Sequence, residues 1–347
     1  MAPKPKIVVD AAALTAFTTR LFNRAGLADD HAATLAEVLM WASLRGVDSH
    51  GVARVPRYLE LLASGEANAK PDIRIESTTP AACTVDADRA PGPVALCAAA
   101  DEAVARARAN GIGSAAVRRT VHTGAIGYYA SRIAEAGLVG IGFVAGMPNM
   151  AYPGVRGAAV ATSPLAIAAP TSEGPIPLLD MATATIALGR IKQYKNAGEP
   201  LPEGAAATAE GVPTTDPDQA VLPLPLGGAK GAGMSLAFEL LTSVLVGEPI
   251  VSAFHGGDRR HRQNALLIAL DPAAFGAGDY PAAVADTIAA VKGLPRLDEA
   301  AVPRIPGERG AATEADRTAD GVPVAAKIWS ELTEAAERLR VVVPAAE

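Results

Sequence analysis

Residues 112–145 read IGSAAVRRTVHTGAIGYYASRIAEAGLVGIGFVA, and this stretch indicates the fold class. The run Ile112 to Val117 predicts a strand, the segment from about Gly124 to Ala136 a helix, and Leu138 to Ala145 a second strand. A strand, a helix and a strand in succession are typical of a sheet covered by helices. We therefore expect an α+β or α/β protein.

The first seventy residues differ, because their apolar residues recur at helical spacing. We expect three helices there, the first capped by Asp10, and residues 1–70 should pack with residues 271–347. Residues 71–270 should form a mixed α/β part that holds substrate and cofactor. The other expected elements are strands at Ala82–Val85, Leu165–Ala168, Leu178–Leu179 and Ala265–Leu270; helices at Pro93–Ala109, Gly231–Val246, Pro281–Lys292 and from near Pro323; and a long loop with little regular structure over Lys195–Leu226.

Composition and charge exclude several classes of protein. The chain has 347 residues, half of them apolar, so it can bury a substantial core. A formal net charge of −6 offers no basic field, so we expect neither nucleic acid nor membrane as a partner. No apolar run could span a bilayer and no signal peptide is visible, which predicts a cytoplasmic protein. Cys83 and Cys97 lack metal-ligand spacing, so we interpret them as core thiols and expect no metal site.

The stretch from Arg45 to Arg54, RGVDSHGVAR, places an acid, a hydroxyl, an imidazole and two cations directly after a predicted helix. His50 can exchange a proton near neutral pH, and Arg54 can hold a carboxylate through two parallel hydrogen bonds. The alternative is a capping loop, in which Asp48 or Ser49 closes the next helix and the other side chains are solvated. The sequence leaves both interpretations open.

A second histidine begins the motif His122-Thr123-Gly124, where a predicted strand gives way to a helix. Unpaired backbone amides at a helix start favour an anion or an electronegative oxygen, so His122 would lie beside such a position. The alternative is that Thr123 caps the helix and His122 is a surface residue.

Four further motifs could contact a flat or anionic ligand. In Asp180-Met181-Ala182-Thr183 an acid follows an apolar strand, although such an Asp is often a helix cap. The glycine-rich turn that ends in Lys230-Gly231 offers backbone amides and an ammonium group to a phosphate. Its glycine spacing matches neither a P-loop nor the GxGxxG motif, and the alternative is a generic turn. Pro306-Gly307-Glu308 is a turn flanked by arginines, and the basic run Asp258–Arg262 could touch a 2′-phosphate or be a solvated loop.

Taken in order, these segments resemble the malate/L-lactate dehydrogenase family of the second type, which includes ureidoglycolate dehydrogenase, sulfolactate dehydrogenase, 2,3-diketogulonate reductase and piperideine-2-carboxylate reductase. The resemblance extends from about residue 8 to residue 340. It implies a helical N-terminal region and a mixed-sheet, non-Rossmann NAD(P)-binding domain like that of sulfolactate dehydrogenase. It also implies a homodimer with sites near the subunit interface. The matching residues are Asp48-Ser49-His50-Gly51 with Arg54, His122-Thr123-Gly124, Thr162-Ser163-Pro164-Leu165 with Ala169-Pro170, Asp180-Met181-Ala182-Thr183, Gly211 to Pro217, Lys230-Gly231 and Pro306-Gly307-Glu308.

The resemblance assigns roles residue by residue. It implies that His50 and His122 are catalytic, with the acid/base role open between them, and that Ser49, Arg54 and Thr162 bind substrate. Some positions depart from the family pattern and put substrate and cofactor preference in doubt: Ser163 replaces an asparagine, Arg190 a lysine, and Asn264-Ala265 a Gly-Gln pair. The residues expected to contact NAD(P)H, with NADH versus NADPH undetermined, are Asp180, Met181, Ala182, Thr183, Lys230, Gly231, Pro306, Gly307 and Glu308.

The expected activity is hydride transfer between NAD(P)H and the α carbon of a small 2-oxo or 2-hydroxy acid, as in malate and lactate dehydrogenases. A ketimine reductase acting on piperideine-2-carboxylate, pyrroline-2-carboxylate or N-alkyl imino acids is the leading alternative. A non-catalytic homologue that binds the cofactor is a more distant one, and a phosphate-handling transferase rests on the loop around Lys230 alone.

Overall fold

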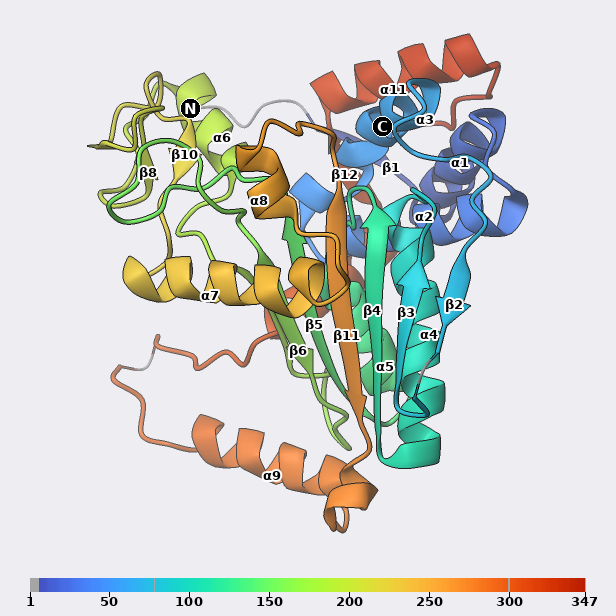
Figure 1. Ribbon diagram of the computed structural model, residues 1–347, viewed down its shortest axis with the longest axis vertical. Coiled ribbons are helices and arrows are strands. Elements are labelled where there is room, and N and C mark those ends of the chain that lie inside the picture. The colour runs from blue at the N-terminus through green and yellow to red at the C-terminus, as the bar shows by residue number, and fades with distance from the viewer. Residues whose placement is uncertain (1–5, 78, 299, 347) are drawn as a thin grey trace.

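The computed structural model describes residues 6–77, 79–298 and 300–346. Its centre is a seven-stranded sheet with the strand order β2-β3-β4-β11-β5-β6-β7 (Figure 1). β3 and β4 run parallel, and every other neighbouring pair in this sheet is antiparallel. The expected mixed sheet with a helical N-terminal region is confirmed. The strands are β2 (Arg74–Glu76), β3 (Ala82–Asp86), β4 (Ile112–Thr120), β5 (Val139–Gly146), β6 (Pro164–Ala168), β7 (Leu178–Ala182) and β11 (Gln263–Leu270).

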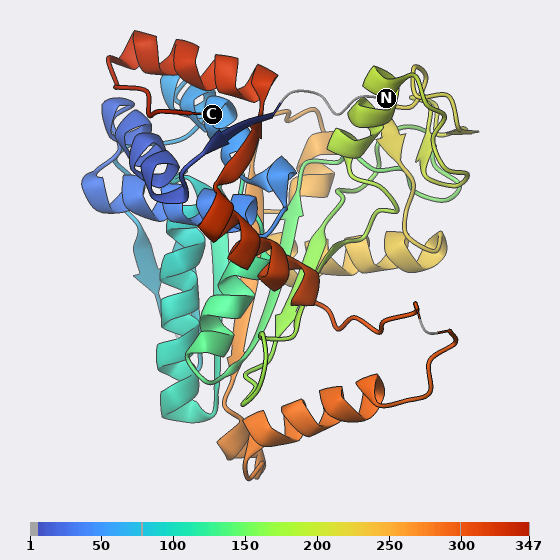
Figure 2. The same ribbon diagram turned by 180° about the vertical axis from the view of Figure 1, so that it is seen from behind.

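Two helices, α4 (Gly92–Asn110) and α5 (Gly127–Glu135), cover one face of this sheet (Figure 2). α4 lies so close to β4 that a Cβ atom at Gly113 would stand 2.0 Å from the carbonyl oxygen of Ala103. Alanines fill much of the core between helix and sheet, because only small side chains fit at this separation. Cys83 and Cys97 are buried free thiols, as expected, and burial raises the pKa of Cys97 to about 12.

The N-terminal helices α1 (Ala11–Arg24), α2 (Asp29–Leu44) and α3 (Val55–Ala63) enclose a second core. Asp10 caps α1 as expected, since its carboxylate accepts the N–H of Ala13 at 2.7 Å. Val121, directly after β4, belongs to this core together with Val55 and Tyr58, so α3 lies near the end of β4.

The C-terminal segment packs on the N-terminal helices, and it also contributes a strand pairing that the sequence analysis did not predict. β1 (Lys6–Val9) pairs antiparallel with β12 (Val322–Ala325), and α11 (Ala326–Leu339) packs beside α1 (Figure 1). The expected helix therefore begins at Ala326, because Pro323 lies in a strand. α9 (Tyr280–Lys292) buries no residue and extends away from the rest of the chain (Figure 1).

The expected long loop is partly wrong. It begins within α6 (Leu188–Ala197) and contains three two-residue strands that form a small sheet, in the order β10-β8-β9. A separate apolar cluster that includes Ile191 and Leu201 supports this small lobe. The strands are β8 (Ala206–Ala207), β9 (Pro213–Thr214) and β10 (Leu222–Pro223).

α7 (Ala229–Glu239) continues into a π-helical turn, η3 (Leu240–Val244), and lies on the sheet face opposite α4 and α5 (Figures 1 and 2). Phe238 anchors it to Phe143 of β5, with 4.9 Å between the ring centroids. The remaining helices are α8 (Ile250–His255), the short 3-10 helix η4 (Pro272–Phe275) and α10 (Glu308–Asp320). Across the described ranges, no helix combines the length and apolar character needed to cross a bilayer.

Candidate active site

The two histidines singled out in the sequence lie together. After α2 the chain forms two short 3-10 turns, η1 (Asp48–His50) and η2 (Val52–Arg54), before α3 begins. This path brings the ring of His50 against that of His122, with 5.8 Å between the centroids and 26° between the planes. Residues 72 positions apart in the sequence therefore form one polar site.

The capping alternative for this stretch is wrong. Arg54 occupies the N-cap position of α3 and no side chain caps that helix. Asp48 instead forms an ion pair with Arg317 of α10, at 2.5 Å. The Oγ atom of Ser49 lies 3.0 Å from Nδ1 of His50, so Ser49 contacts the histidine pair directly.

Arg54 brings a positive charge to this pair. Its Nε donates to the carbonyl oxygen of Ser49 at 2.6 Å, and it forms no ion pair with a carboxylate in the part of the chain that the structure describes. Burial, together with the charge of Arg54, lowers the pKa of His50 to about 4. Burial and the same charge also lower the pKa of His122 well below its usual value. Both imidazoles are therefore neutral at neutral pH.

The hydrogen bonds of His122 determine where its proton lies. Its Nδ1 is 3.2 Å from the backbone N–H of Gly124, which can only donate, so Nδ1 accepts and the proton lies on Nε2. On the other side, the hydroxyl of Tyr58 lies 2.9 Å from Nδ1 and donates to the carbonyl oxygen of His122 at 2.8 Å. His122 thus presents an N–H donor at Nε2.

Tyr58 is a site residue that the sequence interpretation missed. Its position four residues after Arg54 places both side chains on one helix face, which was the available signal. Tyr58 also lies among apolar residues of the second core, where it is 1% exposed. Burial raises the pKa of its hydroxyl, which therefore stays protonated.

The motif Asp180 to Thr183 covers the end of β7, an edge strand of the main sheet, and the residue that follows it. Oδ2 of Asp180 accepts the N–H of Gly127 at 3.0 Å, so this carboxylate meets the start of α5, five residues after His122. Burial of its carboxyl group raises the pKa of Asp180 to about 6, and this effect outweighs the hydrogen bond from Gly127, which lowers the pKa. The residue as a whole still has an exposed side. Asp180 thus connects β7 to the loop that carries the histidine. Met181 and Ala182 pair with Leu165 and Pro164 of β6, which begins two residues after the predicted substrate residue Thr162.

The glycine-rich turn and its lysine lie at the end of β7. A Cβ atom at Gly231 would be 2.5 Å from the carbonyl oxygen of Thr183, so the first turn of α7 packs flush against this strand end. Lys230 is exposed, with no ion pair among the residues that the structure describes. The hydroxyl of Thr183 is buried without a hydrogen-bond partner. An unpaired ammonium, a helix start and an orphaned hydroxyl fit an anionic ligand rich in hydrogen-bonding groups, as a nicotinamide dinucleotide is.

The turn Pro306-Gly307-Glu308 lies at the opposite end of β7. The N–H of Leu178 donates to the carbonyl oxygen of Pro306 at 2.9 Å. Gly307 has φ +98°, and a Cβ atom there would lie 2.8 Å from the carbonyl oxygen of Ile176. The carboxylate of Glu308 pairs with Lys292 at 2.5 Å. The predicted cofactor residues are therefore arranged along one strand. The strand positions that contact the two turns, Leu178 and Thr183, are five residues or roughly 17 Å apart.

A basic cleft of about 830 Å³ opens along α3, where Arg57 lines it, and at the residues that follow this helix. Its lining includes four arginines and one imidazole, with Glu66 as its carboxylate. Arg57 of this lining lies on α3, three residues after Arg54, so the cleft and the histidine pair share the start of this helix. The run Asp258–Arg262, for which a solvated loop was the alternative interpretation, contributes three residues to this cleft. The basic residues of the lining are Arg57, Arg89, Arg259, Arg260 and His261.

The chain as a whole is similar in sequence and in structure to known proteins. The family model of malate/L-lactate dehydrogenases matches residues 9–333. A malate dehydrogenase of Pyrococcus horikoshii is 33% identical over 341 residues, which cover 94% of each chain. The structure of sulfolactate dehydrogenase from Methanocaldococcus jannaschii superposes with a TM-score of 0.87 at 29% identity, over 96% of this chain and 98% of that one. The structure of delta1-piperideine-2-carboxylate reductase from Pseudomonas syringae gives 0.84 at 30% identity, over 95% and 99%.

Proposed function

Because this chain belongs to the malate/L-lactate dehydrogenase family, it is a nicotinamide-dependent oxidoreductase, and we propose that the stacked His50 and His122 beside Arg54 form its catalytic site for small 2-oxo and 2-hydroxy acids. The observation that carries this proposal is a cation without a carboxylate partner among the described residues, next to two neutral imidazoles. A 2-oxo acid presents the matching groups, a carboxylate and an adjacent carbonyl oxygen.

Each side chain has a distinct task in this proposal. When bound, the nicotinamide supplies or accepts the hydride. The guanidinium of Arg54 holds the substrate carboxylate. The Nε2–H of His122 donates to the carbonyl oxygen and stabilises the negative charge that develops there. Protonating Nδ1 of His122 would break its bond from Gly124, so His50 is the imidazole that exchanges the proton.

Substrate binding should prepare His50 for this exchange. In the free protein, burial and the charge of Arg54 hold the pKa of His50 at about 4. A bound carboxylate neutralises Arg54, which removes one cause of the lowered pKa. The pKa of His50 then rises toward the range in which an imidazole both gives and takes a proton.

The basic cleft supports a substrate with a second anionic group. Four arginines and His261 line it, and Arg57 follows Arg54 by three residues on the same helical segment. A second carboxylate or a sulfonate that extends from the histidine pair into the cleft would meet cations. A protonated cyclic imine would meet the same cations and be repelled, so we favour a 2-oxo acid over the imino acid of the piperideine-2-carboxylate reductase.

For the cofactor, we propose that the turn before α7 and Thr183 bind NADH or NADPH, with Lys230 against a phosphate. The orphaned hydroxyl of Thr183 and the exposed ammonium support this assignment. Asp180 would lie near the nicotinamide end, because its contact with Gly127 joins β7 to the histidine loop. The remaining predicted contacts, Met181, Ala182, Gly231 and Pro306 to Glu308, lie along the same strand.

Oxidation of NADH and of NADPH, followed by absorbance with pyruvate, oxaloacetate and piperideine-2-carboxylate, tests these proposals. We expect turnover with the oxo acids and a higher kcat/KM for oxaloacetate than for pyruvate. Charge neutralisation at the cleft by Arg57→Gln should erase the preference for oxaloacetate and leave pyruvate turnover unchanged. Turnover of piperideine-2-carboxylate alone would contradict the oxo-acid proposal, and turnover of pyruvate plus methylamine alone would point to imine reduction.

We also propose that the protein is a homodimer. The outer side of α7 and η3 exposes leucine and valine side chains, and α9 with the turns around it exposes more. Apolar surface of this extent on two exposed segments indicates an interface, and a second copy of the chain is the partner that the family resemblance implies. The exposed side chains are Leu236, Leu240, Leu241, Val244 and Leu245 on the first segment, and Phe275, Val291 and Leu294 on the second.

A further inference from the structure

The loop that carries His122 leaves the sheet through a β-bulge. Thr120 pairs with Gln263 and Val117 with Ala265, so Arg118 and Arg119 both face Asn264 across the ladder. Arg119 has φ +58°, a left-handed conformation for which glycine is the usual residue at such a bulge. Surrounding contacts must therefore hold this conformation in place.

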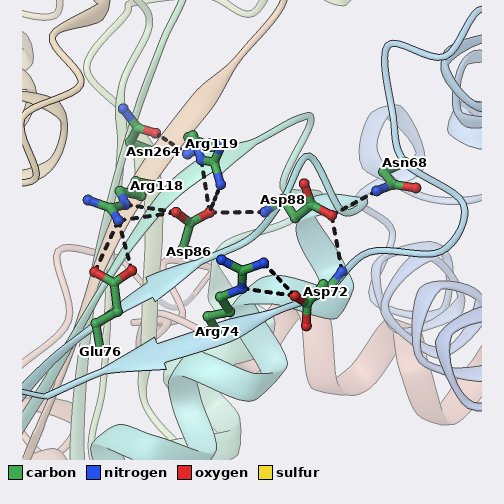
Figure 3. Close-up of polar contacts among 9 residues, drawn as sticks. All are labelled: Asn68, Asp72, Arg74, Glu76, Asp86, Asp88, Arg118, Arg119 and Asn264. Atoms are coloured by element: carbon green, nitrogen blue, oxygen red, sulfur yellow. Dashed lines mark hydrogen bonds and ion pairs between the residues drawn. The ribbon is translucent and has the colours of Figure 1, made fainter.

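A buried carboxylate holds the side chain of Arg119 (Figure 3). Its Nε and Nη2 donate to Oδ1 of Asp86 at 2.8 and 2.5 Å, and Arg118 reaches Oδ2 of the same carboxylate at 3.2 Å. Burial opposes ionisation of Asp86, but the bonds from Arg119 keep its pKa below the usual range. This ion pair fixes the side chain of Arg119 and leaves its backbone N–H to another partner.

That partner is Asn264, which is 1% exposed (Figure 3). Oδ1 of Asn264 accepts the N–H of Arg119 at 3.0 Å, and its Nδ2 donates to the carbonyl oxygen of Glu248 at 3.0 Å. A backbone N–H on one side and a carbonyl on the other allow only one orientation of the amide. Gln263, the neighbour of Asn264, holds the other end of the loop at Thr123. Its Oε1 accepts the N–H of Thr123 at 2.8 Å and the hydroxyl of Thr123 at 2.9 Å.

We propose that Gln263 and Asn264 are positioning residues, which hold both ends of the loop Arg119–Thr123 and so fix the direction of Nε2 of His122. This inference rests on the proposed function for its catalytic consequence. Holding Thr123 keeps the N–H of Gly124 within 3.2 Å of Nδ1 of His122. If Thr123 moved, Nδ1 would lose this donor, and the ring could rotate or place its proton on Nδ1.

The variants Gln263→Met and Asn264→Ala test the proposal in the full chain. Each removes the amide acceptor, and we expect kcat with the best oxo acid to fall roughly 10- to 100-fold, while KM changes little because Arg54 lies on another segment. Long-range ¹H–¹⁵N correlation spectra of the histidine rings should show the Nε2–H form of His122 in the parent protein and a mixture of both neutral forms in the two variants. Gln263→Glu keeps the acceptor for Thr123 and should recover most of kcat and the Nε2–H signal.

Thr242→Val is the matched control, since it removes a buried hydroxyl that donates to the carbonyl oxygen of Phe238 at 2.6 Å and lies outside this loop. It should alter neither kcat nor the His122 spectrum. An unchanged His122 spectrum in both loop variants, or an Nδ1–H form in the parent protein, would overturn the proposal. The spectra need no substrate, so they test the positioning role even if the protein fails to reduce 2-oxo acids. If Gln263→Met does not fold, the spectrum of Asn264→Ala tests it alone.

Discussion

At the scale of single residues, burial and the charge of Arg54 together determine the state of the site. No carboxylate of the described chain neutralises Arg54, and burial together with this charge lowers the pKa of both nearby histidines. An anionic substrate would therefore gain a charge-assisted contact and at the same time shift the histidines toward protonation. Binding and proton transfer are coupled through one guanidinium.

Replacing Arg54 by glutamine should weaken substrate binding and alter the pH profile. Loss of a charge-assisted pair corresponds to roughly a 10- to 100-fold rise in KM for the oxo acid. Hydroxy-acid oxidation needs neutral His50, so its rate falls as pH drops through the pKa of His50, about 4 in the parent protein. Without the charge of Arg54 this pKa rises part of the way to its usual value, since burial, the larger cause, remains. The acid limb of kcat/KM should move to higher pH; a limb that stays in place would show that another group controls it.

The two histidines should behave differently when removed. His50→Ala and His122→Ala should each lower kcat by about 10²–10⁴-fold. The acid limb of the oxidation profile should vanish in His50→Ala and persist in His122→Ala, because only His50 exchanges the proton in our proposal. The opposite pattern would reverse the two roles. His255→Ala, which removes an exposed histidine on α8, serves as the control and should leave kcat unchanged.

At the scale of elements, β7 organises the cofactor side of the site. One end meets the Pro306-Gly307 turn, its middle reaches the start of α5 through Asp180, and its other end supports α7 at Gly231. The sequence identified these motifs separately, but their alignment depends on β7 being an edge strand, which sequence periodicity does not reveal. Sequence periodicity also did not predict α10, because this polar helix has no buried residue and therefore no apolar stripe that a periodic pattern could show.

Gly231→Ala tests the contact between β7 and α7. Its Cβ would lie 2.5 Å from backbone atoms of Thr183 and Leu226, so the helix must move away from the strand. We expect the free energy of unfolding to fall by about 1–3 kcal/mol and the Kd for NADH or NADPH to rise, measured by denaturant titration and by cofactor fluorescence. Gly233→Ala, two residues along the same helix, has open space around its Cβ and should instead raise the free energy of unfolding by about 0.5–1 kcal/mol. Equal effects of the two variants would argue against this contact.

At the scale of the whole molecule, the exposed apolar segments distinguish a monomer from an assembly. Leu240 and Leu245 are 54% and 61% exposed on the outer side of α7 and η3, and α9 stands away from the sheet (Figure 1). In a monomer these apolar side chains are exposed to water, which is unfavourable in free energy. Contact with a second copy of the chain would bury them.

We expect light scattering coupled to size exclusion to give twice the mass of one chain. The double variant Leu240→Glu with Leu245→Glu places charges on the proposed interface and should shift the protein to a monomer with weakened cofactor binding. Val212→Glu carries the same change to an exposed valine of the small lobe and should stay dimeric. A parent protein that elutes as a monomer would contradict the homodimer.

The sequence by itself determined the class of fold, the N-terminal helices and the identity of most candidate residues, because these depend on local periodicity and on motifs that are continuous in the chain. Only the tertiary structure decided that His50 lies against His122, that Tyr58 and Gln263 serve the same loop, and that Asp48 binds Arg317 instead of capping a helix. These contacts join residues tens to hundreds of positions apart. Their energies depend on burial and on exact partners, which no local pattern contains.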